Sequence, residues 1–177
     1  FYCDEYMNSH HFLLETCMYF PFTLAKNLMG YGEEMDDLIG HYPNLQMILV
    51  LAIDEPKAKN RITMNRDGSP QVHYSFSRRT VEAFVAAIKA STQIFFAAGC
   101  KRVHAPCAHQ FFIQQDEKNK IDQLIQKKYF RLGKVSISAA QLMGGCRMGD
   151  DPKTSVTNSW GKVHGMEHLY VADASLF

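Results

Sequence analysis

The last forty residues, Ser138 to Phe177, constrain the fold of this chain more than any other stretch. Three glycines fall within six positions, where the backbone can bend sharply or approach another group closely: Gly144, Gly145 and Gly149. Two turn sequences follow, at Asp151-Pro152 and Trp160-Gly161.

The end of this stretch indicates a ligand. Leu169 to Val171 is a short apolar run that predicts a buried strand, and Ala172, Asp173 and Ala174 follow it directly. Small residues and one acid at the end of a buried strand are typical of a crevice that holds a nucleotide-like ligand. Asp173 can also cap a helix that begins after it, and the two roles are compatible.

Four blocks of this stretch resemble the C-terminal signature of the glucose-methanol-choline (GMC) flavoprotein oxidoreductases. The blocks stand in the order and spacing of the signature at residues 143–149, 151–156, 163–165 and 169–177. They look most like the long-chain alcohol oxidase and cholesterol oxidase-like branch. The rest of the chain fits the substrate domain of the family only loosely.

The resemblance implies FAD as the cofactor and assigns residues to it. Asp173 matches the acid near the ribityl and pyrophosphate groups, and Ala172 and Ala174 are small enough for close backbone approach. Met143 and Gly144 would lie near the isoalloxazine ring by the same analogy. Arg147 is either a partner of the flavin phosphate or part of a buried structural ion pair.

The chain departs from the family at the residue that takes the substrate proton. Counting back three residues from Gly144 reaches Gln141, where the family usually has a histidine. A neutral amide is no general base near pH 7, but it can hydrogen-bond the substrate oxygen. Either another group is the base, or alcohol oxidation is altered or lost. The second family residue, a histidine or asparagine, would follow Phe177.

The resemblance and the pattern together predict an α+β fold. Residues 1–137 are expected to form an antiparallel-sheet substrate-binding domain with packed helices. Residues 138–177 would form the signature segment, with a final strand at 169–172 in the sheet of a Rossmann-like FAD domain that is mostly absent here. Because no Gly-x-Gly-x-x-Gly occurs, we expect this chain to be the C-terminal part of a longer enzyme.

Local patterns predict the elements of the first domain. The apolar run 46–53 predicts a buried strand, and 61–65 and 71–76 predict a hairpin that turns at Asp67-Gly68. On this hairpin, Ile62 and Met64 would share one face and Val72, Tyr74 and Phe76 another, with His73 facing solvent. Helical spacing predicts helices at 77–98 and 116–130, and Val103 is expected to begin a strand.

The first 47 residues are rich in aromatic residues and methionine. The run 11–29 favours a core-facing helix; the alternatives are a wall of an apolar substrate channel and docking on a membrane surface. Glu15, Pro21 and Lys26 leave too short an apolar stretch to span a bilayer. The acidic cluster 33–37 predicts the start of a helix or a solvated loop.

Charge and cysteine content exclude some classes. Nineteen basic and eighteen acidic residues give no reason to expect a nucleic-acid partner. Five cysteines without regular spacing favour reduced thiols in an intracellular or membrane-associated protein. No metal site is expected. One group of possible ligands has a spacing unlike that of structural zinc sites and is interpreted as a chance cluster: Cys100, His104, Cys107 and His109. Cys146 is either an activated thiolate or a small packing residue, and the second is favoured.

The resulting hypothesis is the C-terminal part of an FAD-dependent enzyme that oxidises an alcohol by hydride transfer to flavin. Oxygen, a quinone or a protein would reoxidise the flavin. The aromatic and methionine content of residues 1–31 favours a long-chain or sterol-like substrate, although a core would have the same composition. The alternatives are a redirected or inactive flavoprotein and a partner subunit that completes its site with a separate FAD-binding chain.

Overall fold

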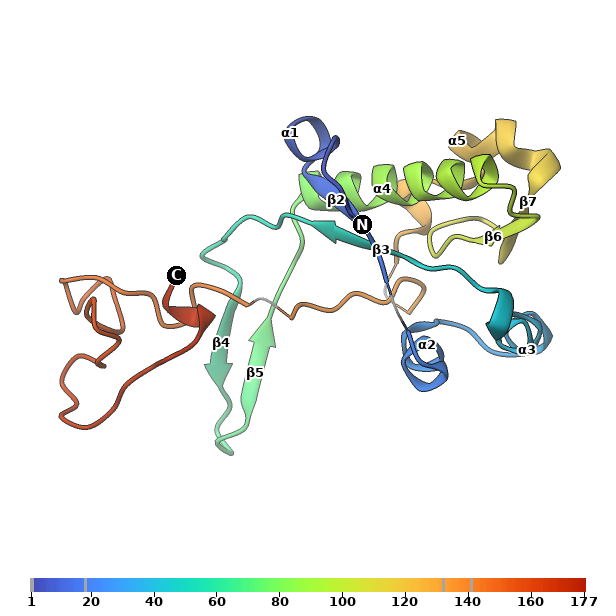
Figure 1. The fold of residues 1–177 in the computed structure, drawn as a ribbon. Helices are drawn as coiled ribbons and strands as arrows, with labels where there is room; N and C mark the ends of the chain where they lie inside the picture. Colours follow the sequence, from blue (N-terminus) through green and yellow to red (C-terminus); the bar gives the residue numbers. More distant parts are fainter. Residues whose placement is uncertain (1, 18, 132, 141) are drawn as a thin grey trace. The chain divides into compact units, whose positions relative to one another are not determined.

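The computed structural model describes residues 2–17, 19–131, 133–140 and 142–177, and the chain divides into two compact units. Unit 1 is residues 1–136 and unit 2 is residues 137–177, a boundary one residue before the one expected from the sequence. Helices and antiparallel sheets make the fold α+β (Figure 1). Each unit is described by itself.

The described residues of unit 1 form strands, helices and short 3-10 helices in mixed order. They are β1 (Tyr2–Cys3), α1 (Met7–His10), β2 (Phe12–Thr16), α2 (Pro21–Asn27), α3 (Glu33–Gly40), η1 (Tyr42–Asn44), β3 (Ile48–Ala52), β4 (Arg61–Met64), β5 (Pro70–His73), α4 (Arg78–Ala97), β6 (Arg102–His104), β7 (Phe112–Gln114), η2 (Gln115–Lys120), α5 (Ile121–Leu124) and η3 (Lys127–Tyr129).

The first sheet has the antiparallel order β1-β2-β3, and α4 packs on it. Phe12 and Leu14 of β2 lie on the same face of the strand and are buried, and Leu14 pairs with Val50 of β3. The expectation of a helix over 11–29 is therefore wrong for its first part, because pairing with β3 buries one face of an extended chain. A helix begins only at Pro21, which fits the first turn of α2.

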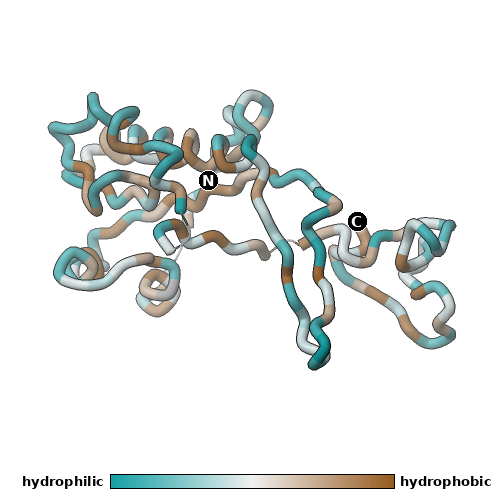
Figure 2. The backbone as a smooth tube through the Cα atoms, turned by 180° about the vertical axis from the view of Figure 1, so that it is seen from behind, coloured by the Kyte–Doolittle hydropathy of each residue, from teal (hydrophilic) through white to brown (hydrophobic). Residues whose placement is uncertain are grey.

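Helix α4 confirms the predicted helix at 77–98. The Ser77 hydroxyl accepts the Thr80 N–H at 2.9 Å, and Gly99 follows the helix with φ +90°. By length and apolar composition α4 could cross a membrane, but a soluble core helix satisfies the same test. Two core clusters pack against it: Ala83, Ala87 and Ala90 meet β2, and Val85, Ile88 and Phe96 meet the β6–β7 region. The hydropathy along the chain is drawn in Figure 2.

The expectation of one helix over 116–130 is wrong. The segment forms η2, α5 and η3, because Ile125 leaves the helical conformation to pair with the loop after β6. Ile125 bridges Ala108, the Leu124 carbonyl accepts the His109 N–H at 2.9 Å, and Gln126 donates to the Cys107 carbonyl. The helical spacing of Ile121 and Ile125 still buries both side chains in one core.

The hairpin β4–β5 confirms the prediction of two strands joined at Asp67-Gly68. The Asp67 carboxylate accepts the Ser69 N–H at 3.0 Å, and Gly68 takes φ +81°. The assignment of faces is wrong, because the register places Ile62 opposite Val72 and so puts both on the same face. His73 is exposed, as expected, on the other face.

The other local expectations have mixed outcomes. Val103 lies in β6, and α3 carries acidic residues in its first turn. The strand 46–53 is observed as β3, but its residues are half-buried or exposed rather than fully buried. In unit 2, the expected strand 169–172 does not form within this chain, since Tyr170 makes only an isolated bridge with Lys162.

Candidate functional site

Backbone pairing, rather than an apolar core, holds unit 2 together. Of its described residues, Thr157 and Gly161 alone are buried. Thr157 makes a parallel bridge with Met148 and an antiparallel bridge with Val163. Its hydroxyl also donates to the Cys146 carbonyl at 3.3 Å. One small, fully buried residue therefore joins three stretches of the segment.

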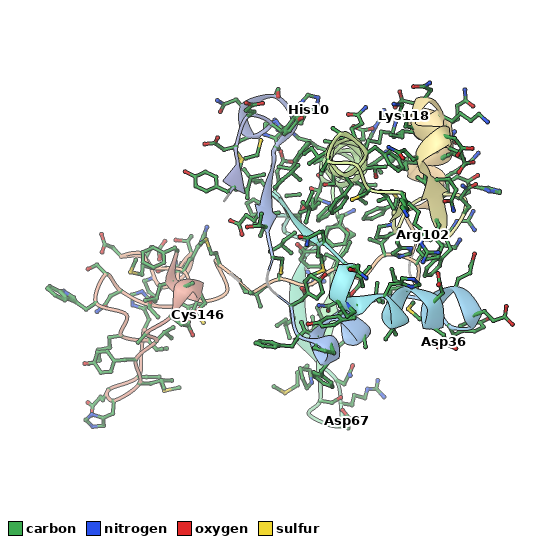
Figure 3. All side chains as sticks on the ribbon, turned by 45° about the vertical axis from the view of Figure 1, so that its right-hand side comes forward. His10, Asp36, Asp67, Arg102, Lys118 and Cys146 are labelled. Carbon is green, nitrogen blue, oxygen red and sulfur yellow. The ribbon has the colours of Figure 1, made fainter. Side chains whose placement is uncertain are left out.

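Two segments of the signature that are about thirty residues apart in sequence lie side by side. The Cys146 N–H donates to the Ser175 carbonyl at 2.9 Å, and the Met148 N–H donates to the Leu176 carbonyl at 3.0 Å. Cys146 lies within this unit in Figure 3. A Cβ added at Gly145 would lie 3.7 Å from the Cβ of Ser175, an ordinary van der Waals contact, so the pairing itself does not require glycine there.

These bonds bring together most of the residues expected to contact the cofactor. Met143 and Gly144 precede the paired stretch on one side, and Ala172, Asp173 and Ala174 belong to the other. Met143, Gly144, Ala172 and Asp173 are exposed, and Ala174 is half-buried. Gln141, the residue expected at the substrate oxygen, lies outside the described residues.

Asp173 caps the short 3-10 helix η4 (Ala174–Leu176). Its Oδ1 accepts the Ser175 N–H at 2.8 Å and the Ser175 hydroxyl at 2.5 Å. These two bonds lower the pKa of the Asp173 carboxyl below its usual value. Both bonds use Oδ1, so the carboxylate is held in one orientation as an anion while its surface stays exposed.

Gly161 fixes the strand-like stretch that leads to Asp173. The Gly161 N–H closes a turn on the Asn158 carbonyl, and the Gly161 carbonyl accepts the Val171 N–H at 2.8 Å. Gly161 has φ +75°, and a Cβ there would lie 2.5 Å from the Val171 carbonyl oxygen. No other residue type fits without a backbone shift. The turn predicted at Trp160-Gly161 therefore also positions Val171.

A serine–histidine contact ties the turn at Asp151 to the rest of unit 2. The Ser155 hydroxyl donates to the Asp151 carbonyl at 2.7 Å, and His164 Nε2 lies 3.0 Å from the Gly149 carbonyl. Because a carbonyl only accepts, Nε2 carries the proton. A Cβ on Gly149 would lie 3.0 Å from that of Ser155. The sequence analysis did not predict this group of contacts, although all of its residues lie inside the resembling blocks.

Arg147 faces an open hollow of about 380 Å³ on unit 2. The hollow is lined by Gly144, Gly145, Arg147 and residues 152–156. Arg147 Nε donates to the Thr154 carbonyl at 2.7 Å, and the residue is exposed. The alternative of a buried ion pair is therefore wrong. Cys146 is half-buried, and its role as a thiolate or as a packing residue stays a prediction.

The cysteine–histidine group in unit 1 does not gather into one site. Cys107 is fully buried in the core, and burial raises the pKa of its thiol to about 12. His104 Nδ1 lies 2.9 Å from the Phe111 carbonyl, and burial lowers the pKa of its ring. His109 packs edge-on against Tyr129. Among the described residues, no three histidine, cysteine or carboxylate side chains are placed to hold a metal ion.

One family model matches most of the chain, and two curated proteins match short stretches of it. The family model described as GMC oxidoreductase matches residues 56–177, which is more than half of the chain. Paromamine 6'-oxidase of Streptomyces fradiae is 51% identical over 35 residues, which cover 20% of this chain and 6% of that protein. The 6'''-hydroxyparomomycin C oxidase of Streptomyces lividus is 43% identical over 37 residues, 21% of this chain and 7% of that protein.

The matched parts are thus a small share of each curated relative's length. No solved structure matches the chain. The family match includes the hairpin, α4 and all of unit 2, where the paired segments 143–148 and 172–177 lie. The chain belongs to the GMC oxidoreductase family.

Proposed function

We propose that this chain is the C-terminal, substrate-side part of an FAD-dependent oxidoreductase that oxidises an alcohol to a carbonyl compound. The observation that carries the proposal is the pairing of Cys146 with Ser175 and of Met148 with Leu176, in a chain of this family. The pairing joins the two stretches that carry the residues which the family resemblance assigns to the flavin. The Gly-rich part that would complete the cofactor site is supplied by another region or another chain.

The residues of unit 2 fit a flavin in size and in charge. Gly144, Gly145 and Ala172 expose backbone with little or no side chain, which allows a flat ring to approach closely. The anionic Asp173 carboxylate can accept hydrogen bonds from ribityl hydroxyls. When bound, FAD would supply the hydride acceptor, and these residues would orient it.

The proton of the substrate hydroxyl needs a base, and unit 2 has two histidines among its described residues, His164 and His168. His164 is turned to the Gly149 carbonyl with its Nε2 proton, so it holds the fold instead of facing a substrate. Gln141 can hold the substrate oxygen through its amide but cannot take the proton. His168 is exposed beside Glu167. The base is therefore this histidine or a group elsewhere in the full enzyme, or the chemistry is redirected.

Two substrate classes compete. Long-chain or sterol-like alcohols were favoured by the aromatic residues near the N-terminus. Of these, Phe12 is buried in the core of unit 1, whereas Tyr2, Phe20, Phe22 and Tyr31 are exposed. The names of the curated relatives favour the hydroxyl of an amino sugar. The electron acceptor is oxygen, a quinone or a protein.

The first test is the visible spectrum of the full-length enzyme before and after anaerobic addition of each alcohol class. Bleaching of flavin bands by one class supports hydride transfer and assigns the substrate. Bands that persist with all alcohols would favour a redirected flavoprotein. Absence of flavin from the intact enzyme, even after incubation with FAD, would overturn the proposal.

A pair of variants tests the role of Asp173. Asp173→Asn keeps an oxygen that can cap η4, whereas Asp173→Ala removes both the cap and the charge. If the carboxylate contacts flavin, both variants should release FAD more readily than the wild type. If Asp173 only caps the turn, Asp173→Asn should retain FAD normally and Asp173→Ala alone should lose it.

A further inference from the structure

The connection between the neighbouring strands β2 and β3 is long. Thr16 pairs with Ile48, and residues 17–47 lie between the two strands in sequence. Antiparallel neighbours are usually joined by roughly two to five residues, and long connections in compact domains are often functional, for example as lids. This connection contains α2, α3 and η1, so it has structure of its own. We call residues 19–45 the flap.

The two ends of the flap meet at its root. The Tyr42 hydroxyl donates to the Tyr19 carbonyl at 2.8 Å, and the two rings pack edge-on with their centroids 5.7 Å apart. Closer to the strands, the Cys17 N–H donates to the Met47 carbonyl at 3.5 Å. A segment that leaves and returns at one place can turn about that place as one body.

The backbone of the flap is bonded to itself. Among the described residues, the backbone N–H groups of α2, α3 and η1 that donate find their carbonyls within the flap, as Leu28 does at Leu24 and His41 does at Asp37. No strand of the described chain pairs with the flap. Opening of the flap would therefore break side-chain contacts and leave its helices intact.

An ion pair and an apolar contact join the flap to the β6–β7 region. Arg102 Nη1 of β6 lies 2.5 Å from Asp37 Oδ2 of α3, the helix that carries the labelled Asp36 in Figure 3. Met35 is buried, and a Cβ added at Gly30 would lie 3.1 Å from Met35 Cε and 3.4 Å from the Phe111 ring. The flap and the start of β7 therefore meet at this point.

The β6–β7 side of the contact is held in place by its own residues. The Arg102 guanidinium lies 4.2 Å from the centroid of the Phe112 ring, and the ring centroids of His104 and Phe111 are 4.2 Å apart. This surface therefore keeps its shape when the flap leaves it. The hydrogen bond from Arg102 lowers the pKa of the Asp37 carboxyl, so both members of the ion pair are charged near pH 7.

We propose that the flap is a lid that opens about its Tyr19–Tyr42 root as a folded unit, with the Asp37–Arg102 ion pair as its latch. The open state would make the Phe111 ring and the Arg102 guanidinium accessible to a ligand or to solvent. The proposal does not depend on the proposed reaction.

The test is oxidation of methionine by dilute hydrogen peroxide in the full-length protein, measured residue by residue with mass spectrometry. The peroxide transfers one oxygen atom to the thioether, which gives the sulfoxide and water. Met64 is 78% exposed and reports the rate at an accessible side chain, whereas the buried Met35 reacts when the flap is open. We expect Met35 to react more slowly than Met64, while the amides of α3 stay protected from hydrogen exchange.

Removal of the latch should raise the oxidation rate of Met35. Arg102→Gln and Asp37→Asn should each raise it about threefold, the effect of a partly exposed ion pair, and the double variant should raise it no further. Molar salt should raise the rate in the wild type and change it little in the variants, because the peroxide is uncharged. Asp122→Asn is the matched control: it removes the 2.7 Å ion pair with Lys89, which lies outside the flap, and should leave the rate unchanged.

Each part of the proposal has a result that would overturn it. If Met35 oxidation and hydrogen exchange of the α3 amides rise together, the flap unfolds instead of opening as a unit. If Met35 reacts only as fast as the whole protein unfolds, the flap does not open. If Met35 reacts as fast as Met64, the flap is not closed in solution. If salt and both single variants leave the rate of Met35 unchanged, the Asp37–Arg102 pair is not the latch.

Discussion

Replacement of Gly161 by alanine tests whether unit 2 depends on close backbone contact. Gly161 has φ +75°, and alanine pays roughly 1–2 kcal/mol in the left-handed region. Its Cβ would also lie 2.5 Å from the Val171 carbonyl oxygen, which cannot rotate away as a flexible side chain does. Forcing the backbone apart adds about 1–3 kcal/mol, as overpacking does elsewhere. We therefore expect Gly161→Ala to destabilise unit 2 by about 2–5 kcal/mol.

Gly165 provides a matched control four residues later. It has the same φ of +75°, but a Cβ there meets nothing within 4 Å. Gly165→Ala should therefore lose only the roughly 1–2 kcal/mol of the left-handed conformation. The difference between the two variants isolates the contact with Val171 from the cost of the backbone angle.

The assay is hydrogen exchange of the amide of Val171 in the full-length protein, with urea denaturation as the global measure. The Val171 N–H donates to the Gly161 carbonyl, so its protection reports on the contact directly. Gly161→Ala should lose most of this protection, and Gly165→Ala should lose little. Equal losses in the two variants would refute the reasoning, because the contact would then contribute nothing beyond the backbone angle.

Three further predictions concern unit 1. Burial by itself raises the pKa of Asp54, but hydrogen bonds from the Thr80 and Tyr74 hydroxyls lower it below its usual value. Its contribution to stability is thus present above about pH 4 and is lost as pH falls through the folded-state pKa. Asp54→Asn should therefore lower the free energy of unfolding by about 1–2 kcal/mol at pH 7 and by less at acidic pH. Urea denaturation at several pH values measures this difference. Ser77→Ala removes the acceptor for the Thr80 N–H and should lower the free energy of unfolding by about 1 kcal/mol in the same assay; no change would mean that water replaces the cap. Cys107, with its raised thiol pKa of about 12, should resist iodoacetamide in the native protein and react once urea unfolds it; rapid native labelling would contradict its burial.

Local patterns predicted an element of unit 1 correctly where the hydrophobic periodicity and the residues at the ends of the element, such as a cap or a turn, agreed. Helix α4 has both an apolar stripe and the caps Ser77 and Gly99, and the β4–β5 turn has Asp67-Gly68. Prediction failed where a distant strand or loop competed. Residues 12–16 extend to pair with β3, and Ile125 leaves its helix to pair with Ala108. Neither partner can be identified from a local window of sequence.

The residues of the candidate site follow from the glycines and from the resemblance and stay predictions, and the geometry of the segment could not be predicted from either. The resemblance names Gly144 and Asp173, but no local pattern in the sequence indicates that the Cys146 N–H donates to the Ser175 carbonyl. The Ser155–His164 contact could not be predicted, because the spacing of the two residues in the sequence matches no known motif. Such contacts form only when turns bring distant segments together, and the order of the motifs along the chain does not specify which residues then meet.

Several large apolar side chains of unit 2 are exposed instead of packed in a core. Its closure depends on Gly149, Thr157 and Gly161 and on backbone bonds, while Leu142, Met143, Trp160 and Phe177 are 68%, 66%, 84% and 72% exposed. In unit 1 the side chains of similar size fill two core clusters. Substitutions of the exposed residues should therefore leave the internal bonds of unit 2 intact. Substitutions of the buried Thr157 and Gly161 should break the unit itself. That separation lets cofactor retention and folding of the signature segment be measured independently.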